Sequence, residues 1–313
     1  MAQPVVAAVL FAATGLTPVE AESPNAERIE DLYWFVSFWA AVVLLAVAVP
    51  LTIFVIRYRS RGRARTVEGP QIHGSTKLEI AWTLVPVVIL LFVIAFTFYK
   101  LPGITLEDEA RASDLRIRVE GRQFYWQYRY PNGVIAIDRL VAPQDRLVVL
   151  EITAPESDVN HSYWIPALGG KFDAIPGQTV ETAFQARRPG IFEGQCAEFC
   201  GIQHAKMFAS VEVLPAEEFD SWLDDQARRQ EAGTSELGEQ IFEGACSKCH
   251  GPEGQGLIGP AFTAANTSDP EAIEQVVRNG RGKMPMVGEE WDDRQMKALT
   301  DYLSERFGEE EAR

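Results

Sequence analysis

The chain has 313 residues, of which 47% are hydrophobic and 23% are charged, and its net charge is −15. This length fits two domains plus connections, and the composition argues against a disordered, collagen-like or disulfide-dense chain. The acidic balance argues against a nucleic-acid-binding protein, because phosphate recognition needs clustered lysine and arginine.

The charge is unevenly distributed along the chain. Residues 1–100 carry eight basic and seven acidic side chains, whereas residues 101–313 carry 21 basic and 37 acidic ones. Such an acidic part attracts basic partners at low salt, and it also serves simply to keep a domain soluble. Charge alone does not choose between these two interpretations.

Two stretches are free of charge and long enough to cross a membrane. Tyr33–Ile56 has 24 residues and Ile80–Tyr99 has 20, and a helix of about 20 residues spans a hydrocarbon core of roughly 30 Å. Pro50 and Pro86 are better tolerated in membrane helices than in soluble ones. Two buried core helices are the alternative, which the length and spacing of the stretches disfavour.

The segment between these stretches is basic. Its charged residues are Arg57, Arg59, Arg61, Arg63, Arg65 and Lys77 against Glu68 and Glu79. The positive-inside rule therefore puts this loop in the cytoplasm and both termini outside. We predict a bacterial inner-membrane protein with two spans and its soluble domains on the periplasmic side.

Composition divides the chain into five parts. Residues 1–32 form an N-terminal segment with a weakly marked signal peptide and small-residue cleavage points near Ala13 and Ala21. We predict a transmembrane hairpin over 33–100, a β-domain over 101–214, a linker helix over 215–233 and a helical domain over 234–313.

The β-domain is predicted from short alternating runs. Leu115–Val119 alternates apolar and polar residues, and the next strand presents Phe124, Trp126, Tyr128 and Tyr130 on one face. Leu147–Ile152 and Thr179–Phe184 are similar, and Pro-Gly turns separate the runs. Many short strands of this kind indicate a sandwich or a barrel.

The helical part is predicted from its caps. Ala216–Ala232 indicates a helix that ends at Gly233, and Thr234 or Ser235 offers an N-cap to the next helix. A last helix is expected near Asp292–Phe307.

The first of two cysteine clusters is Cys246-Ser-Lys-Cys249-His250, the C-x-x-C-H pattern of c-type haem attachment. The two thiols add to haem vinyl groups and the histidine reaches the iron. A thioredoxin-like redox pair is the alternative, but the βαβ context that it needs is absent. Met284, which precedes a proline, is the expected sixth ligand, and Met286 competes with it. The segment Glu239–Phe307 thus resembles a class I cytochrome c domain.

The second cluster packs Cys196, Cys200, His204 and Met207 into twelve residues, with His161 a further 35 residues upstream of Cys196. Two disulfides are the simplest alternative outside the membrane, but close Cys pairs with nearby histidine are typical of ligands. Thiolate and thioether are soft ligands, and the thioether favours copper over zinc. A blue-copper site uses one cysteine, whereas two in a C-x3-C loop can bridge two coppers.

This region resembles the binuclear copper (CuA) centre of cytochrome c oxidase subunit II. The residues that carry the resemblance are His161-Ser162, Asp173-Ala-Ile-Pro-Gly177, and Gly194-Gln-Cys-Ala-Glu-Phe-Cys-Gly201 with His204 and Met207. The resemblance implies that the two cysteines bridge both coppers and that each histidine binds one. Met207 and the main-chain carbonyl of Glu198 complete the ligand set. The resemblance also implies a cupredoxin-like, all-β domain. The predicted chain is then a membrane-anchored multidomain protein. It consists of a two-helix transmembrane hairpin, a cupredoxin-like domain and an all-α cytochrome c domain.

The resemblance extends to residues outside the copper cluster. The start of the family's second span resembles the run Leu78-Glu79-Ile80-Ala81-Trp82-Thr83. Within this run, Glu79 matches a carboxylate at the mouth of a proton channel. The alternative is a solvated glutamate at the end of a helix. The Glu198 side chain resembles a ligand to magnesium at the subunit interface. Asp173 lies in the loop that faces the large subunit, unless it simply caps a turn. His73 is expected to be solvated.

One position departs from the family pattern. In Gln123-Phe124-Tyr125-Trp126, Phe124 stands where family members commonly carry a tryptophan that receives electrons from soluble cytochrome c. The fused haem domain offers a reason, because it can deliver electrons itself. A conservative aromatic exchange in the core is the alternative.

Together with the resemblance, these features predict an electron-entry subunit of a respiratory, proton-translocating haem–copper cytochrome c oxidase. Electrons would pass from a covalent haem c to the copper pair and then to the large subunit, which reduces oxygen to water. The four histidines leave none for an oxygen site on this chain. The implied partners are subunit I with its haem and copper, subunit III, and an outside donor such as a basic cytochrome c or the upstream respiratory complex. The alternatives are the matching subunit of a nitric oxide reductase with a dicopper centre, or a membrane-tethered electron carrier. A quinol oxidase subunit is disfavoured, because it would not need the copper ligands.

Overall fold

A computed structural model describes residues 17–59, 71–104, 111, 114–233 and 236–308. They belong to two units, one of residues 28–102 and the other of residues up to 27 together with residues from 103 onwards. Several predicted features lie outside the described residues: the cleavage point near Ala13, the loop charges Arg61, Arg63, Arg65 and Glu68, and the caps Thr234 and Ser235.

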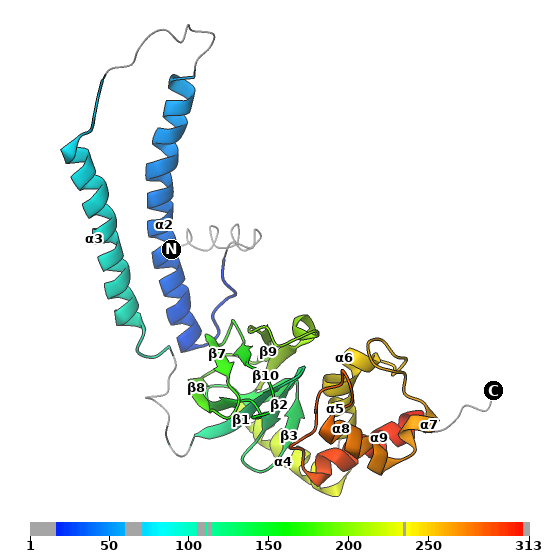
Figure 1. Cartoon of the computed structure of the whole chain (residues 1–313). Helices are drawn as coiled ribbons and strands as arrows, with labels where there is room; N and C mark the ends of the chain where they lie inside the picture. The colour runs from blue at the N-terminus through cyan, green and yellow to red at the C-terminus, as the bar shows by residue number, and fades with distance from the viewer. Residues whose placement is uncertain (1–16, 60–70, 105–110, 112–113, 234–235, 309–313) are drawn as a thin grey trace. The chain divides into compact units, whose positions relative to one another are not determined.

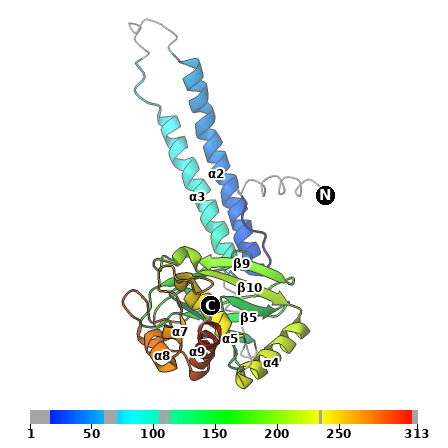
Figure 2. The ribbon, with the colours of Figure 1, turned by 90° about the vertical axis from the view of Figure 1, so that its right-hand side faces the viewer.

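The unit of residues 28–102 is a pair of apolar helices. Helix α2 covers Pro24–Arg57 and helix α3 covers Thr76–Lys100, and both are long and apolar enough to cross a membrane. They run side by side in both views (Figures 1 and 2), with Phe35 stacked on Phe96 at 4.1 Å between ring centroids. The two predicted apolar helices are confirmed.

Helix α2 begins earlier than its charge-free stretch. The helix starts at Pro24, whereas the uncharged run starts at Tyr33. Proline suits the first helical position because its missing N–H has no helical partner there, and the acidic Glu27 favours the first turn. The helix therefore includes a polar turn ahead of its apolar part.

The β-domain consists of two five-stranded sheets (Figure 1). One sheet has the order β3-β2-β1-β5-β8 and the other β4-β10-β9-β6-β7. The strands are β1 Leu115–Arg122, β2 Tyr125–Arg129, β3 Ile135–Ile137, β4 Arg139–Pro143, β5 Val148–Thr153, β6 His161–Trp164, β7 Lys171–Ala174, β8 Val180–Phe184, β9 Gly190–Cys196 and β10 Phe208–Leu214. Strand β1 pairs in parallel with β5, and β10 with β4. The predicted cupredoxin-like sandwich is confirmed.

Strands β2 and β3 are buried on both faces. Trp126 and Tyr128 point into the core between the sheets, whereas Tyr125, Ile135 and Ile137 belong to a second core with the C-terminal helices. Alternate residues of a strand point to opposite faces. The sequence pattern showed only the first of these faces, because a helical domain covers the second.

The C-terminal part is helical, as predicted. Its helices are α4 Ala216–Ala232, α5 Leu237–Ile241, the π-turn η3 Phe242–Cys246, α6 Ser247–His250, α7 Ala264–Thr267, α8 Pro270–Asn279 and α9 Asp293–Phe307. Helix α4 ends at Gly233 with φ 69°, the left-handed conformation that glycine adopts without strain. The capping box of Asp292 with Gln295 begins α9. Helices α5, α8 and α9 gather on one side of the sheets (Figure 1).

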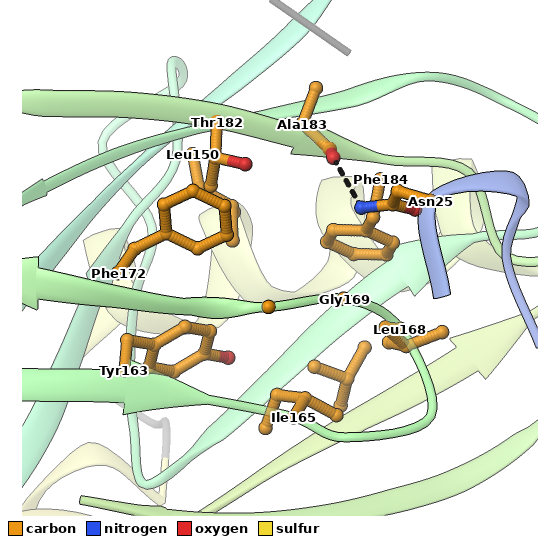
Figure 3. Close-up of a pocket in the computed structure, with 12 residues that line it drawn as sticks. Asn25, Leu150, Tyr163, Ile165, Leu168, Gly169, Phe172, Thr182, Ala183 and Phe184 are labelled. Carbon is orange, nitrogen blue, oxygen red and sulfur yellow. Dashed lines mark hydrogen bonds between the residues drawn. The ribbon is translucent and has the colours of Figure 1, made fainter. Parts of the chain in front are cut away.

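The segment just before residue 28 is bound to the β-domain. Ser23 Oγ donates to Leu168 O (2.7 Å), and Asn25 Nδ2 donates to Ala183 O (3.1 Å). Figure 3 shows Asn25 at the edge of a small cavity of about 30 Å³ beside Phe184 and Leu168. Glu22 forms an ion pair with Arg188. These residues, predicted as part of an N-terminal segment, therefore contribute to the β-domain.

Candidate copper and haem sites

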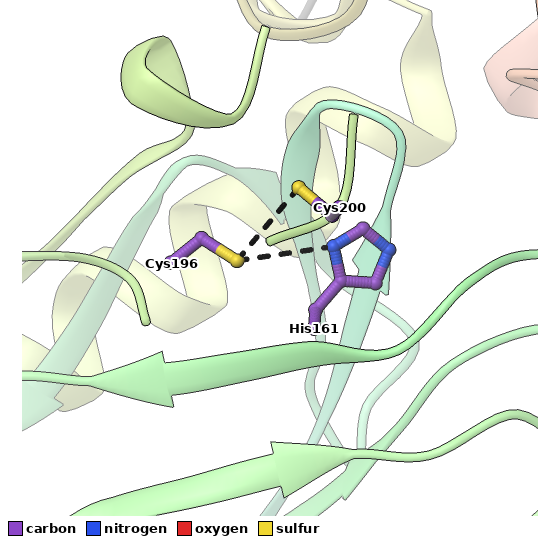
Figure 4. A group of neighbouring side chains, drawn as sticks. All are labelled: His161, Cys196 and Cys200. Atoms are coloured by element: carbon purple, nitrogen blue, oxygen red, sulfur yellow. Dashed lines mark hydrogen bonds between the residues drawn. The ribbon is translucent and has the colours of Figure 1, made fainter. Parts of the chain in front are cut away.

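Sulfur and imidazole atoms meet at one end of the β-domain. Cys196 ends strand β9, Cys200 follows in the next loop, and His161 begins strand β6. The Sγ atoms of the two cysteines are 3.9 Å apart, and Cys196 Sγ lies 4.0 Å from His161 Nδ1. Figure 4 shows the three side chains pointing toward one another. Their ligand atoms all lie within 4.8 Å of one another.

Three further donors complete this cluster. Cys200 Sγ lies 3.6 Å from His204 Nδ1 and 3.7 Å from Met207 Sδ. Cys196 Sγ lies 3.2 Å from the carbonyl oxygen of Glu198. The predicted set therefore comes together from strands β6 and β9 and from the loop between β9 and β10. Both cysteines are buried and free, so the predicted disulfide alternative is not the arrangement seen.

Backbone hydrogen bonds hold the loop that carries these donors. Cys196 N donates to Met207 O (2.9 Å), and Ala197 N donates to Ser162 O (2.8 Å). The Cys200 thiol, together with His161 and the backbone of Ser162, lowers the pKa of Cys196. A thiol with a lowered pKa readily supplies the thiolate that soft metals bind. Two thiolates, two imidazoles and a thioether are a donor set for copper.

Asp158 is a residue that the sequence analysis missed. Its Oδ1 lies 3.2 Å from His161 Nε2, and its Oδ2 accepts the backbone N–H of Gln123 at 3.1 Å. The His161 side chain is 0% exposed. A carboxylate on one ring nitrogen fixes the tautomer and leaves the other nitrogen free as a metal ligand. The only sequence signal was an acidic residue three positions before the histidine.

The C-x-x-C-H segment lies on a second site, a cavity of about 480 Å³ in the helical domain. Cys246, Cys249 and His250 line one wall and Met284 lines another. The remaining walls are largely apolar, with Ile273, Val277, Leu299 and Leu303 among the lining residues. Volume, lining and the paired thiols fit a covalently bound haem.

The imidazole of His250 is oriented by a main-chain carbonyl and by an aromatic ring. Its Nδ1 lies 2.7 Å from Pro260 O, so Nδ1 carries the proton and Nε2 is left for the iron. The ring stacks on Phe262 with centroids 4.5 Å apart. A Cβ atom at Gly259 would stand 2.7 Å from the imidazole, so only glycine fits there.

The two candidate axial methionines differ in position. Met284 lines the cavity and packs on the helical core. Met286 is 40% exposed and is not among the lining residues. The arrangement favours Met284, as the following proline had suggested.

The remaining predicted residues, apart from Phe124, lie at the surface. Glu79 is exposed near the start of α3 and its Oε1 accepts the N–H of Ser75 at 3.3 Å. His73 is exposed, and so are Asp173 on strand β7 and the side chain of Glu198. Phe124 is buried, with 6% of its surface exposed. Its ring lies against Gly201 beside the copper loop.

Comparison with known proteins identifies the family of the chain. Family models for the transmembrane and periplasmic domains of cytochrome c oxidase subunit II match residues 12–101 and 134–214. Subunit 2 of the oxidase from Alkalihalophilus pseudofirmus is 34% identical over 274 residues, which cover 84% of this chain and 78% of that one. The chain belongs to the cytochrome c oxidase subunit II family.

Further comparisons concern the C-terminal domain, a second relative and one solved structure. A model of the cbb3-type cytochrome c oxidase subunit III matches residues 234–303, so this subunit II carries a cytochrome c domain. The Cereibacter sphaeroides subunit 2 is 33% identical over 72% of this chain and 82% of that one. The crystal structure of the periplasmic domain of subunit II from Bradyrhizobium japonicum is 33% identical and covers 38% of this chain and 97% of that one, with a TM-score of 0.36.

Proposed function

We propose that this chain is the subunit through which electrons enter a haem–copper cytochrome c oxidase. The observation that carries the proposal is the joint presence of a dicopper-type donor cluster and a C-x-x-C-H cavity in one chain of the subunit II family. The large subunit of the complex then reduces oxygen to water, and this chain supplies it with electrons.

The residues that hold the copper pair have distinct roles. Cys196 and Cys200 would hold both ions, and His161 and His204 would each hold one. Met207 and the carbonyl of Glu198 would complete the ligand set. Bound copper supplies one-electron redox chemistry, and the β-sheet scaffold keeps the donors fixed so that little rearranges between redox states.

The haem site is built in the same way. Cys246 and Cys249 would attach the haem, and His250 and Met284 would hold its iron. A thioether ligand and an apolar cavity both favour a high reduction potential. The fixed Nδ1–Pro260 hydrogen bond keeps the imidazole aimed at the iron position.

We further propose roles for two exposed carboxylates and a placement in the membrane. Glu198 binds magnesium at the contact with the large subunit, and Glu79 takes up protons from the cytoplasmic side. The loop after α2 faces the cytoplasm and the two cofactor domains face the periplasm of a bacterial inner membrane. The donor is a basic cytochrome c or an upstream respiratory complex, which the acidic soluble part attracts.

The test is metal and haem analysis of the full-length chain, matured with haem and loaded with copper in detergent. Two coppers per covalent haem, with one electron shared over both coppers by electron spin resonance, support the proposal. One copper, zinc, or a Cys196–Cys200 disulfide after copper loading would refute the dicopper site. Oxygen consumption against nitric oxide consumption by the assembled complex decides between an oxidase and a nitric oxide reductase.

A further inference from the structure

One lysine lies between the two haem-attaching cysteines, at the wall of the cavity, and its side chain reaches into the β-domain. The Lys248 side chain is only 13% exposed. Its Nζ donates to the main-chain oxygen of Phe124 at 2.8 Å and lies 2.6 Å from Asp138 Oδ2. A buried ammonium with both a charged and a neutral acceptor is a strongly held group.

The main chain of the same residue is held by the copper loop. Gln203 Nε2 donates to Lys248 O at 2.9 Å, and the Gln203 side chain is buried with 5% exposed. Gln203 directly precedes His204, and Lys248 directly precedes Cys249. One hydrogen bond therefore joins the residue beside a copper ligand to the residue beside a haem thioether.

A second connection runs through the Phe124 loop. Gln123 Nε2 donates to Cys200 O at 2.6 Å. At Gly201, a Cβ atom would stand 3.0 Å from this amide nitrogen and 2.9 Å from the Phe124 ring. Lys248 thus reaches the Cys200 carbonyl through the Phe124 main chain and the Gln123 side chain.

We propose that Lys248 is a positioning residue that fixes the haem-attachment segment against the copper-ligand loop. Its ammonium holds Phe124 O and Asp138, and the Gln203 amide holds its main-chain oxygen. The inference rests on the proposed function of the two sites. One electron leaves the reduced haem and enters the oxidised copper pair, and no bond or proton moves at Lys248, Gln203 or Phe124.

The test uses the full-length, haem- and copper-loaded chain with two variants. Lys248→Met keeps the length of the side chain but removes its donor, and Gln203→Leu removes the amide. Lys297→Met is the matched control, because Lys297 is exposed on α9 and pairs only with Asp301 one turn away. Haem and copper contents and the optical spectra are measured first, so that a failure of the proposed function appears in the unmodified chain.

The first readout is hydrogen exchange, which does not depend on activity. Losing one hydrogen bond to a charged or buried group is expected to raise exchange at the amides of residues 201–206 by about tenfold or more. The second is the light-triggered rate of haem-to-copper electron transfer, which should fall in both variants and not in the control. Unchanged protection and an unchanged rate in Gln203→Leu would overturn the proposal, even if Lys248→Met failed to incorporate haem.

Discussion

At the scale of single residues, a carboxylate orients one of the proposed copper ligands. Asp158 bridges the Nε2 of His161 and the backbone N–H of Gln123. Its two oxygens therefore aim the imidazole at the cysteines and tie that histidine to the Phe124 loop. Partners of this kind set the affinity of a site as much as its ligands do.

We expect Asp158→Asn to weaken copper binding by about 10–100-fold, the usual cost of removing such a partner. The amide keeps the size of the side chain but presents a donor where the carboxylate accepted. Copper(II) titration of the protein, after its thiols have been reduced and the reductant removed, followed by electron spin resonance, measures the loss. Asp301→Asn, which alters only an exposed pair with Lys297, should bind copper normally. Equal affinities in the two variants would contradict the assigned role.

Asp292 at the start of α9 predicts a pH dependence. Partial burial acts to raise the pKa of this carboxyl, but the backbone N–H of Gln295 and the Arg294 guanidinium outweigh it, so the pKa lies below its ordinary value of 3.8. A pKa that is lower in the folded state stabilises the fold above the unfolded pKa. This contribution is lost as the pH falls through the folded value.

Asp292→Asn should therefore lower the free energy of unfolding at pH 7 by about 0.5–1 kcal/mol, a modest value because the side chain is partly screened by solvent. Asparagine remains a good N-cap, so the variant isolates the charge. Denaturant unfolding followed by haem absorbance measures the difference, which should shrink below the ordinary carboxyl pKa. A difference that stays constant into acid would show that charge is not its cause.

At the scale of elements, the cytochrome domain depends on a close crossing of its first and last helices. A Cβ atom at Gly238 in α5 would stand 2.2 Å from the Ala298 carbonyl in α9. Backbones this close leave no space for a side chain. Leu237, Ile241, Leu299 and Leu303 pack around the crossing in one core.

Gly238→Ala should thus destabilise the helical domain by about 1–3 kcal/mol or more, because overpacking forces backbone to move. Thermal unfolding of the haem-loaded chain, followed by haem absorbance, would show the lower midpoint. Ser304→Ala on the exposed face of α9 is the control and should leave the midpoint unchanged. A wild-type midpoint in Gly238→Ala would mean that the helices separate at little cost.

At the scale of the whole molecule, the cytochrome domain is fixed to the sandwich by a buried interface. Tyr125 Oη donates to Val287 O at 2.7 Å and accepts from Trp291 Nε1 at 2.9 Å. Arg122, with 2% of its side chain exposed, contacts both Glu120 and Glu290. Buried groups of this kind separate only if several polar atoms lose their partners together.

Tyr125→Phe removes two of these bonds and leaves a buried carbonyl and an indole N–H unpaired. We expect the two domains to lose about 1–3 kcal/mol of mutual stabilisation. Calorimetry of the full chain would then show two transitions that separate further than in the unmodified protein. Tyr302→Phe, which affects a hydroxyl contact with Arg306 within the helical domain, is the control; identical traces for both variants would argue against a fixed interface.

Several features could be predicted from short stretches of sequence. The charge-free runs gave two helices, alternation gave the strands, and C-x-x-C-H and C-x3-C gave the two sites. These patterns are local, because ligand spacing and side-chain period depend on neighbours within a few residues. The burial of the outer face of β2 was not predicted. The helical domain that covers this face lies more than a hundred residues away in the chain.

The sequence by itself therefore determined which groups are available: four thiols, four imidazoles, five thioethers and two apolar helices. Only the tertiary structure decided which of them meet. His161 joins Cys196 because β6 pairs with β9, Asp158 joins His161 through a turn, and Lys248 reaches Phe124 across the domain boundary. Contacts between distant segments depend on how whole sheets and helices pack, and no local pattern encodes that packing.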